Sequence, residues 1–289
     1  MDALFPNPAA LESFRAGLKT RALGHAVDYR AEAGSTNDLC LEAARGGAAH
    51  GLLVIADAQT SGRGRRGRTW QAPAGKALLF SVLCRIENLR AERLGWVALA
   101  AGQACAEALR DLAGVAAQPK WPNDVVLLAH APGELAAQAG APAAIAWKKL
   151  GGILCEGVIA DAGGGFVVVG IGLNVLQEPH ELPPQAKAPP TSVRIESARA
   201  IERLALLSGV LARLEVRLDA LRDETEFAFQ RRELEEVLRD AWSGYALRVS
   251  ANGREIDGRF EGLDEFGRLR LNCAGVSQLF ADAEILGAW

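Results

Sequence analysis

Four arginines and three glycines are concentrated in SGRGRRGRTW, residues 61–70. Arginine presents a planar fork of N–H donors that suits carboxylate and phosphate oxygens. Such a segment would serve either nucleic-acid binding or a loop that closes over an anion during a reaction. It lies between a strand-like run that ends at Gln59 and the anchor Trp70, and a flexible charged segment between two fixed points is typical of a lid. We therefore favour the lid over a solvated basic turn.

An empty lid of this composition is expected to be poorly ordered. Ordering a flexible backbone costs roughly 1–2 kcal/mol per residue, and neighbouring arginines repel one another. A bound anion would offset both costs, so the ordered lid is expected only with ligand.

Three more motifs place polar groups beside strand-like runs. In KWPNDVV the residue before proline is pushed out of helical backbone, which predicts an extended Trp121 with Asn123 and Asp124 at the entrance of a strand. In KKLGGIL, Lys149 precedes two glycines that permit close backbone approach. GIGLNV presents Asn174 at a strand end and lacks the third glycine and following helix of a dinucleotide-binding motif. Taken alone, KWPNDVV also fits a structural turn, and a lysine before a strand carries little information.

The composition limits the function classes. The chain has 289 residues, 49% of them hydrophobic, so it can build a large core. A formal net charge of −3 gives no basic excess outside the arginine segment, which disfavours a dedicated nucleic-acid-binding protein. The five cysteines are scattered, which disfavours disulfides and zinc and favours a reducing cytoplasm. No signal peptide or membrane-spanning stretch is evident, so no membrane partner is expected.

The elements that must position these motifs can be read from apolar patterning. Ser35, Thr36 and Asn37 are all N-cap residue types, so a helix is expected to begin among them and to end at Gly46-Gly47. Further helices are predicted over residues 91–114, 198–222 and 224–240, the first with a single buried stripe. Short apolar runs bounded by glycine, proline or charge predict buried strands: GLLVIADAQ, ALLFSVLCRI, WPNDVVLL, KKLGGILCEGVIA and FVVVGIGLNV.

The C-terminal part changes character. From Gly244 onward, apolar and polar residues alternate around the hairpin signals Asn252-Gly253 and 264–267. Because isolated hairpins are unstable, a small β-barrel is expected. The chain is thus predicted to be α+β, with a catalytic domain at residues 1–240 and a small domain at 241–289. The alanine-rich residues 131–147 are expected to form an extended loop or hairpin insertion.

Taken together and in this order, the motifs resemble the biotin protein ligases. The matching pieces are STN at 35–37, Gln59 with GRGRRGRTW at 62–70, KWPND at 120–124, KLGGIL at 149–154 and GIGLNV at 170–175. The resemblance runs from about residue 23 to the C-terminus. It implies a mixed-sheet domain with flanking helices, related to class II tRNA synthetases and lipoate ligases, and a C-terminal SH3-like barrel. Some members begin with a DNA-binding domain; Ser35 lies so near the start that the monofunctional form is expected.

The resemblance also implies a reaction in two steps. The biotin carboxylate attacks the α-phosphate of Mg²⁺-ATP to give biotinyl-5′-AMP, and a specific lysine of a biotin carboxyl carrier protein then takes the biotin. A homodimer through the catalytic-domain sheet is the favoured assembly, and no nucleic acid is expected as a partner. Two alternatives stay open: a lipoate-type ligase of the same fold, and a nucleic-acid-binding protein that uses the arginine segment.

Residue roles follow from the same resemblance. Lys149, Arg65 and Asp124 are expected to be catalytic, with Lys149 bridging the biotin carboxylate and the α-phosphate. Asp124 is the candidate to orient magnesium or the incoming lysine amine. The biotin site is predicted to comprise Ser35, Thr36, Asn37, Gln59, Arg63, Gly64, Arg65 and Lys149. The nucleotide site is predicted to comprise Arg66, Arg68, Trp121, Asn123 and Asn174.

Overall fold

The computed structural model describes residues 3–86, 89–130, 145–159, 164–183, 188–242 and 244–288. One mixed sheet dominates it, with the strand order β1-β2-β3-β7-β6-β12-β8-β9-β10-β11 and with β4 and β5 attached beside β6. Only β1 and β2 pair in parallel among the pairs described; every other described pair is antiparallel. The α+β prediction with a large mixed sheet is therefore confirmed.

Five strands, at residues 53–59, 77–85, 124–130, 145–159 and 165–174, follow the predicted apolar runs, whereas the strands at 27–33 and 117–120 were not predicted. The strands of the larger part of the chain, the described residues up to Trp242, are β1 Val27–Ala33, β2 Leu53–Gln59, β3 Ala77–Arg85, β4 Ala117–Lys120, β5 Asp124–His130, β6 Ile145–Ile159 and β7 Gly165–Asn174. Those of the C-terminal part are β8 Ala246–Ala251, β9 Arg254–Leu263, β10 Leu269–Cys273, β11 Val276–Phe280 and β12 Glu284–Ala288. The helices are α1 Pro8–Gly17, α2 Thr36–Arg45, α3 Trp96–Ala113, α5 Val193–Glu196, α6 Arg203–Ala220 and α7 Glu224–Trp242.

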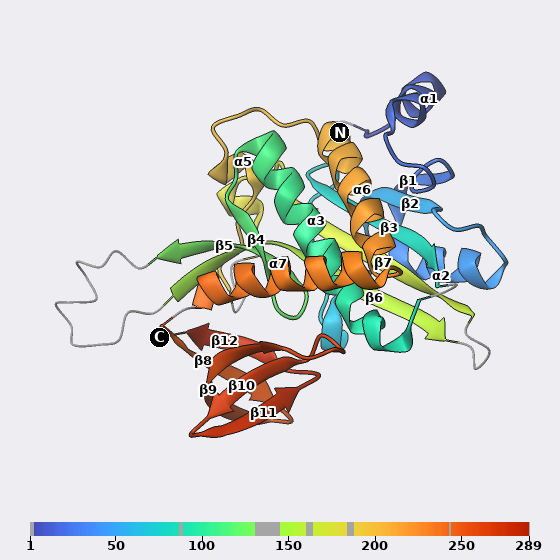
Figure 1. Ribbon diagram of the computed structural model, residues 1–289. Coiled ribbons are helices and arrows are strands. Elements are labelled where there is room, and N and C mark those ends of the chain that lie inside the picture. The colour runs from blue at the N-terminus through green and yellow to red at the C-terminus, as the bar shows by residue number, and fades with distance from the viewer. Residues whose placement is uncertain are drawn as a thin grey trace.

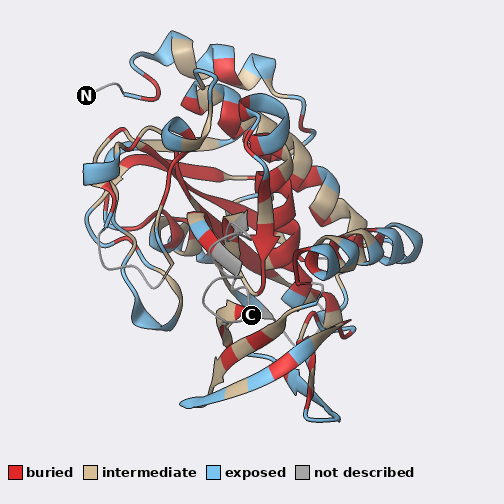
Figure 2. Ribbon diagram, turned by 90° about the vertical axis from the view of Figure 1, so that its left-hand side faces the viewer, coloured by how far each residue is buried: buried red, intermediate tan, exposed pale blue. Residues whose placement is uncertain are grey.

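Helices cover both faces of the central sheet (Figure 1). Successive strand residues face opposite sides, so Val54 packs with α2 while its neighbours Leu53 and Ile55 join the main core with α3 and α6. The strands at the centre of the molecule are buried almost throughout (Figure 2). This buried centre carries KLGGIL in the middle of β6 and GIGLNV in the C-terminal half of β7.

The C-terminal strands β8 to β12 form a separate group at one end of the molecule (Figure 1). Asn252 and Gly253, both with positive φ, make the tight turn between β8 and β9, as the sequence predicted. Two indole N–H groups of the larger part hydrogen-bond to this group. Trp96 Nε1 donates to the carbonyl of Glu265, and Trp121 Nε1 donates to the carbonyl of Gly267. The C-terminal strands therefore sit against the elements that carry KWPND.

Several local predictions need correction. The predicted single stripe on the 91–114 helix is wrong: α3 is buried on almost all sides because helices and strands surround it, while Leu112 at its end is 38% exposed. The helix predicted from 198 begins at Arg203, after a short α5 that apolar patterning did not reveal. Residues 121–123 form a turn between β4 and β5 instead of an extended segment. Of the predicted 131–147 insertion, residues 145–147 belong to β6, and 131–144 lie outside the described residues.

Candidate functional site

Two adjoining cavities lie where the arginine loop, residues 62–70, crosses the middle of β6 and the C-terminal half of β7. The first has a volume of about 130 Å³ and the second about 510 Å³. Residues of both cavities form the boundary between them: Arg68, Thr69, Trp70, Lys120, Asp124, Lys149 and Glu284. The first cavity gathers most of the predicted site residues: Ser35, Thr36, Asn37, Gln59, Arg63, Gly64, Arg65, Arg66, Arg68, Asn123, Asp124 and Lys149. Motifs far apart in the sequence thus meet at one place.

The N-terminus of α2 forms a polar wall of the first cavity. Of the three N-cap candidates Ser35, Thr36 and Asn37, the structure has Ser35 as the cap, with its Oγ 3.5 Å from the backbone nitrogen of Asp38. Gln59 Oε1 accepts hydrogen bonds from both the backbone N–H and the hydroxyl of Thr36, at 2.7 and 3.1 Å. Beneath them the hydroxyl of Ser81 on β3 contacts Thr36 Oγ1 at 2.9 Å and Asn37 Oδ1 at 2.6 Å. This network fixes the orientation of three polar side chains that face one pocket.

The two glycines of GIG on β7 make room for the side chains opposite them. A Cβ on Gly170 would overlap Asn37 Oδ1, and one on Gly172 would lie 2.8 Å from the indole of Trp70. Both positions therefore require glycine for close approach. Trp70 Nε1 is buried and has no hydrogen-bond partner among the described residues. An unsatisfied buried donor beside a cavity is a site where a ligand acceptor would be stabilised.

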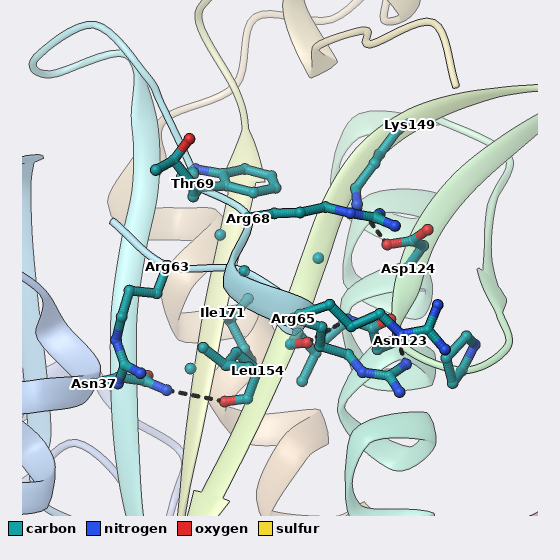
Figure 3. Close-up of a pocket in the computed structure, with 18 of the residues that line it drawn as sticks. Asn37, Arg63, Arg65, Arg68, Thr69, Asn123, Asp124, Lys149, Leu154 and Ile171 are labelled. Carbon is teal, nitrogen blue, oxygen red and sulfur yellow. Dashed lines mark hydrogen bonds and ion pairs between the residues drawn. The ribbon is translucent and has the colours of Figure 1, made fainter. Parts of the chain in front are cut away.

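Each arginine of the loop pairs with an acidic residue. Arg63 lies beside Asn37 of α2 (Figure 3). It pairs with Asp38 and Glu156. The other three pair with the C-terminal group: Arg65 and Arg66 with Asp282, at 2.6 and 2.9 Å, and Arg68 with Glu284. These carboxylates offset the mutual repulsion that the sequence analysis expected. Arg66 itself has a left-handed backbone, φ 55°, which is uncommon for a residue other than glycine.

Lys149 and Asp124 form the other side of the first cavity (Figure 3). Lys149 Nζ donates to Asp124 Oδ1 at 2.6 Å, and Lys120 Nζ lies 3.8 Å from Asp124 Oδ2. Lys120 is buried, donates to the carbonyl of Ile285 at 3.2 Å, and lies 4.7 Å from the ring centre of Trp147. Burial lowers the pKa of its ammonium. One carboxylate thus lies between two lysine amines.

Burial likewise acts on the arginine at the centre of the loop. Desolvation lowers the pKa of Arg65 below its ordinary value, and the charges of Arg66 and Arg68 add to this effect although Asp282 opposes it. Its Nη1 also donates to Asn123 Oδ1 at 3.2 Å. Burial thus disfavours the charged form of Arg65, and an anion bound beside it would favour that form.

The predicted nucleotide residues divide between the two cavities. Asn174 lines the second cavity, with its amide hydrogen-bonded to the carbonyl of Thr191 and to Gln177. Asn123 lines the first and donates to the carbonyl of Ile153 at 2.6 Å. Trp121 lines neither cavity: it is 1% exposed and anchors the C-terminal group instead.

Sequence reasoning missed four polar residues that surround the predicted ones. Ser81, Glu156, Asp282 and Glu284 lie within strand patterns or near the C-terminus and belong to no motif that was singled out. A signal existed only for Glu156, which follows KKLGGIL by two residues. Ser81, Asp282 and Glu284 lie at the site because of strand pairing and packing between distant segments, which the local sequence does not reveal.

The described residues offer no ready-made metal site. No cluster of three or more histidine, cysteine, aspartate or glutamate side chains with ligand geometry occurs in the part of the chain that is described. Over the same residues, no helix is long and apolar enough to cross a membrane.

Comparisons with known proteins show which family and fold the chain resembles. The model of the Biotin/lipoate A/B protein ligase family matches residues 34–174. The biotin--[acetyl-CoA-carboxylase] ligase of Mycobacterium tuberculosis is 34% identical over 266 residues, which is 90% of this chain and 88% of the relative. The enzyme of the same name from Paracoccus denitrificans is 32% identical and covers 87% and 96% of the two chains. The biotin protein ligase from Aquifex aeolicus in complex with biotin and ATP has the same fold, with a TM-score of 0.70 at 24% identity over 90% and 99% of the chains.

Proposed function

The chain belongs to the biotin protein ligase family, and on that premise we propose how its two cavities carry out the reaction. It is an ATP-dependent biotin ligase, as are the relatives that match it over most of their length. The single observation that carries the proposal is the position of Lys149, which lines both cavities and so can contact ligands in each.

The first cavity is proposed to bind biotin. The ureido ring needs matched donors and acceptors in a small space. Ser35, Thr36, Asn37 and Gln59 supply such groups, and Ser81 holds two of them in place. Trp70 and the glycine strand β7 supply the apolar wall for the rest of the bicycle. Arg63, Gly64 and Arg65 lie on the loop that would close over the acid end.

The second cavity is proposed to bind the nucleotide. It contains Asn174, Arg68 and the apolar side chains of Trp147, Ile285 and Leu286, against which a base can pack. Arg66 is proposed to contact phosphate from the loop and Asn123 to line the junction of the cavities. We withdraw Trp121 from this set, because it is buried outside both cavities.

The first half-reaction joins two anions, so its barrier is lowered by fixed positive charge in a site that excludes water. Lys149 is proposed to bridge the biotin carboxylate and the α-phosphate. To do so its amine must leave Asp124, whose second oxygen still faces Lys120 at 3.8 Å. Arg65 is proposed to stabilise the phosphate and keep the mixed anhydride enclosed.

Magnesium is proposed to enter with ATP and to be held mainly by phosphate oxygens, as Mg²⁺ commonly is. Asp124 does not fit a preformed magnesium site, since both of its oxygens face lysine amines. Asp124 is instead proposed to orient the incoming amine of the second half-reaction. That amine belongs to a lysine on a biotin carboxyl carrier protein, and its attack on the anhydride releases AMP.

The proposal extends to the domain boundaries, the assembly and the location of the protein. We propose domains at residues 1–240 and 241–289, the second an SH3-like barrel, a homodimer through the edge of the catalytic-domain sheet, and a cytoplasmic location. The five cysteines are all free, which suits a reducing compartment.

The experiment that tests the assignment is substrate competition in the first half-reaction. Pyrophosphate release should require biotin and ATP, and lipoate should replace biotin poorly. Equal turnover with lipoate would favour the lipoate-type alternative. ATP-independent binding to nucleic acid, without pyrophosphate release, would favour a nucleic-acid-binding protein that uses the arginine segment.

A further inference from the structure

Glu156 on β6 contacts two proposed biotin-site residues but lines neither cavity itself. Its carboxylate forms a fork with the guanidinium of Arg63: Oε1 to Nη1 at 2.9 Å and Oε2 to Nη2 at 2.6 Å. Oε2 also accepts a hydrogen bond from Asn37 Nδ2 at 2.8 Å. One carboxylate therefore joins the arginine loop to the N-terminus of α2.

The contact with Asn37 determines which way its amide points. Asn37 Nδ2 donates to Glu156 and to the carbonyl of Leu154, and Oδ1 accepts from Ser81. A rotated amide would place its oxygen against a carboxylate and a carbonyl, and acceptor facing acceptor is unfavourable. The absent Cβ of Gly170 leaves the space in which this amide lies.

The contact with Arg63 fixes one end of the loop to the sheet. Among the described residues, Arg63 pairs with the acids Glu156 and Asp38 of the larger part, whereas Arg65, Arg66 and Arg68 pair with Asp282 and Glu284 of the C-terminal group. Burial lowers the pKa of Arg63, but the two carboxylates outweigh it and the net pKa is raised. The two ends of the loop are thus held by different parts of the molecule.

We infer that Glu156 is a positioning residue for biotin binding, which holds Asn37 and Arg63 in the geometry that the first cavity needs. Arg63 is then the anchor of the loop and acts through its pairing with Glu156, while Arg65 carries the ligand contact. This inference rests on the proposed assignment of the first cavity to biotin.

The test is the steady-state kinetics of adenylate formation by Glu156→Gln. The variant keeps the shape of the side chain but loses its charge, so the fork to Arg63 weakens. The side chain at 156 also ceases to favour one orientation of the Asn37 amide over the other. We expect the KM for biotin to rise about tenfold, the scale of one charge-assisted hydrogen-bonded contact. The KM for ATP and kcat at saturating biotin should stay within a factor of about two.

Coupling separates positioning from general destabilisation. If Glu156 acts partly through Arg63, then Arg63→Gln also raises the KM for biotin, and the double variant raises it by less than the product of the two single effects. Asp257→Asn is the matched control, because it removes a similar fork, to Arg248 at 2.7 and 2.9 Å, that lies in the C-terminal hairpin. It should leave the KM for biotin unchanged.

Folding is checked by thermal unfolding of each variant. Should Glu156→Gln fail to fold, Asp38→Asn removes only the second partner of Arg63 and should give a smaller rise in the KM for biotin. An unchanged KM in a folded Glu156→Gln variant, a loss confined to kcat, or strictly multiplicative effects would each overturn the inference. If the unmodified protein formed no adenylate from biotin, the proposed function would fail instead.

Discussion

At the scale of single residues, the proposed mechanism depends on one amine that pairs with a carboxylate in the structure. Lys149 pairs with Asp124 at 2.6 Å, whereas the proposed role directs its charge to substrate oxygens. Lys149→Ala should reduce the rate of adenylate formation more than a hundredfold, about 3 kcal/mol, the scale of losing a preorganised charge donor. Pyrophosphate release measures it.

The neighbouring lysine supplies the control. Lys148 is 46% exposed at its side chain and pairs with Glu196, so Lys148→Ala should keep near-normal activity. If the two variants exchanged these effects, Lys148 would be the catalytic amine.

Arg65 gives the second residue-scale prediction. Arg65→Gly removes the charge that we expect to retain the adenylate, so the variant should still form biotinyl-5′-AMP but release it. Released adenylate acylates stray amines, and peptide mass spectrometry of an added bystander protein would detect biotinylated lysines. Arg232→Gly, a helix-surface substitution outside both cavities, is the comparison. Equal bystander labelling by the two variants would refute the retention role.

At the scale of elements, the arginine loop is held by acids of another part of the chain. Asp282 pairs with two of its arginines. Asp282→Asn should therefore speed trypsin cleavage within residues 62–68 in the absence of ligand, and biotin with ATP should slow it. The control is Asp240→Asn at an exposed position of α7, and trypsin should cleave this variant at the same rate as the unmodified protein. Cleavage that ignores both the substitution and the ligands would contradict the lid interpretation.

A helix-to-loop contact gives a prediction about pH. Glu215 of α6 is buried and accepts hydrogen bonds from the backbone N–H groups of Arg21, Ala22 and Leu23, at 2.6, 2.8 and 3.0 Å. Desolvation raises its pKa, but these bonds outweigh it and the net pKa is lowered below 4.5. Because the folded pKa is the lower one, its stabilisation is full above pH 4.5 and disappears as pH falls through the folded value.

Glu215→Gln should accordingly lower the free energy of unfolding by about 1–3 kcal/mol at pH 7, the range for hydrogen bonds to a charged group. The difference from the unmodified protein should shrink below about pH 4.5. Denaturant unfolding at several pH values measures it, with exposed Glu226→Gln as the comparison. A difference that is independent of pH would show that the charge of Glu215 is not what stabilises the loop.

The same scale shows what local sequence could predict. Strand and hairpin positions followed from apolar runs and from Asn252-Gly253, because those signals are contained in the residues that form the element. The burial of α3 on almost every side did not follow, since it depends on which elements surround the helix. The ion pairs of the loop were missed for the same reason: Asp282 lies more than 200 positions from Arg65 and Arg66.

At the scale of the whole molecule, the C-terminal strands contribute directly to the site. Glu284 lines both cavities, Ile285 and Leu286 line the second, and the carbonyl of Ile285 accepts from Lys120 beside Asp124. The site is therefore complete only where the two parts of the chain meet. The C-terminal strands therefore contribute side chains to the proposed site as well as to the fold.

The most direct test of the account is biotin transfer by the full chain. The protein is incubated with biotin, ATP, magnesium and a biotin carboxyl carrier domain, and the mass of the carrier is measured intact and after digestion. We predict one biotin per carrier domain, on a single lysine, dependent on ATP and abolished when that lysine is replaced by arginine. A carrier that stays unmodified while the protein is folded, or that is modified equally well with lipoate, would contradict the account.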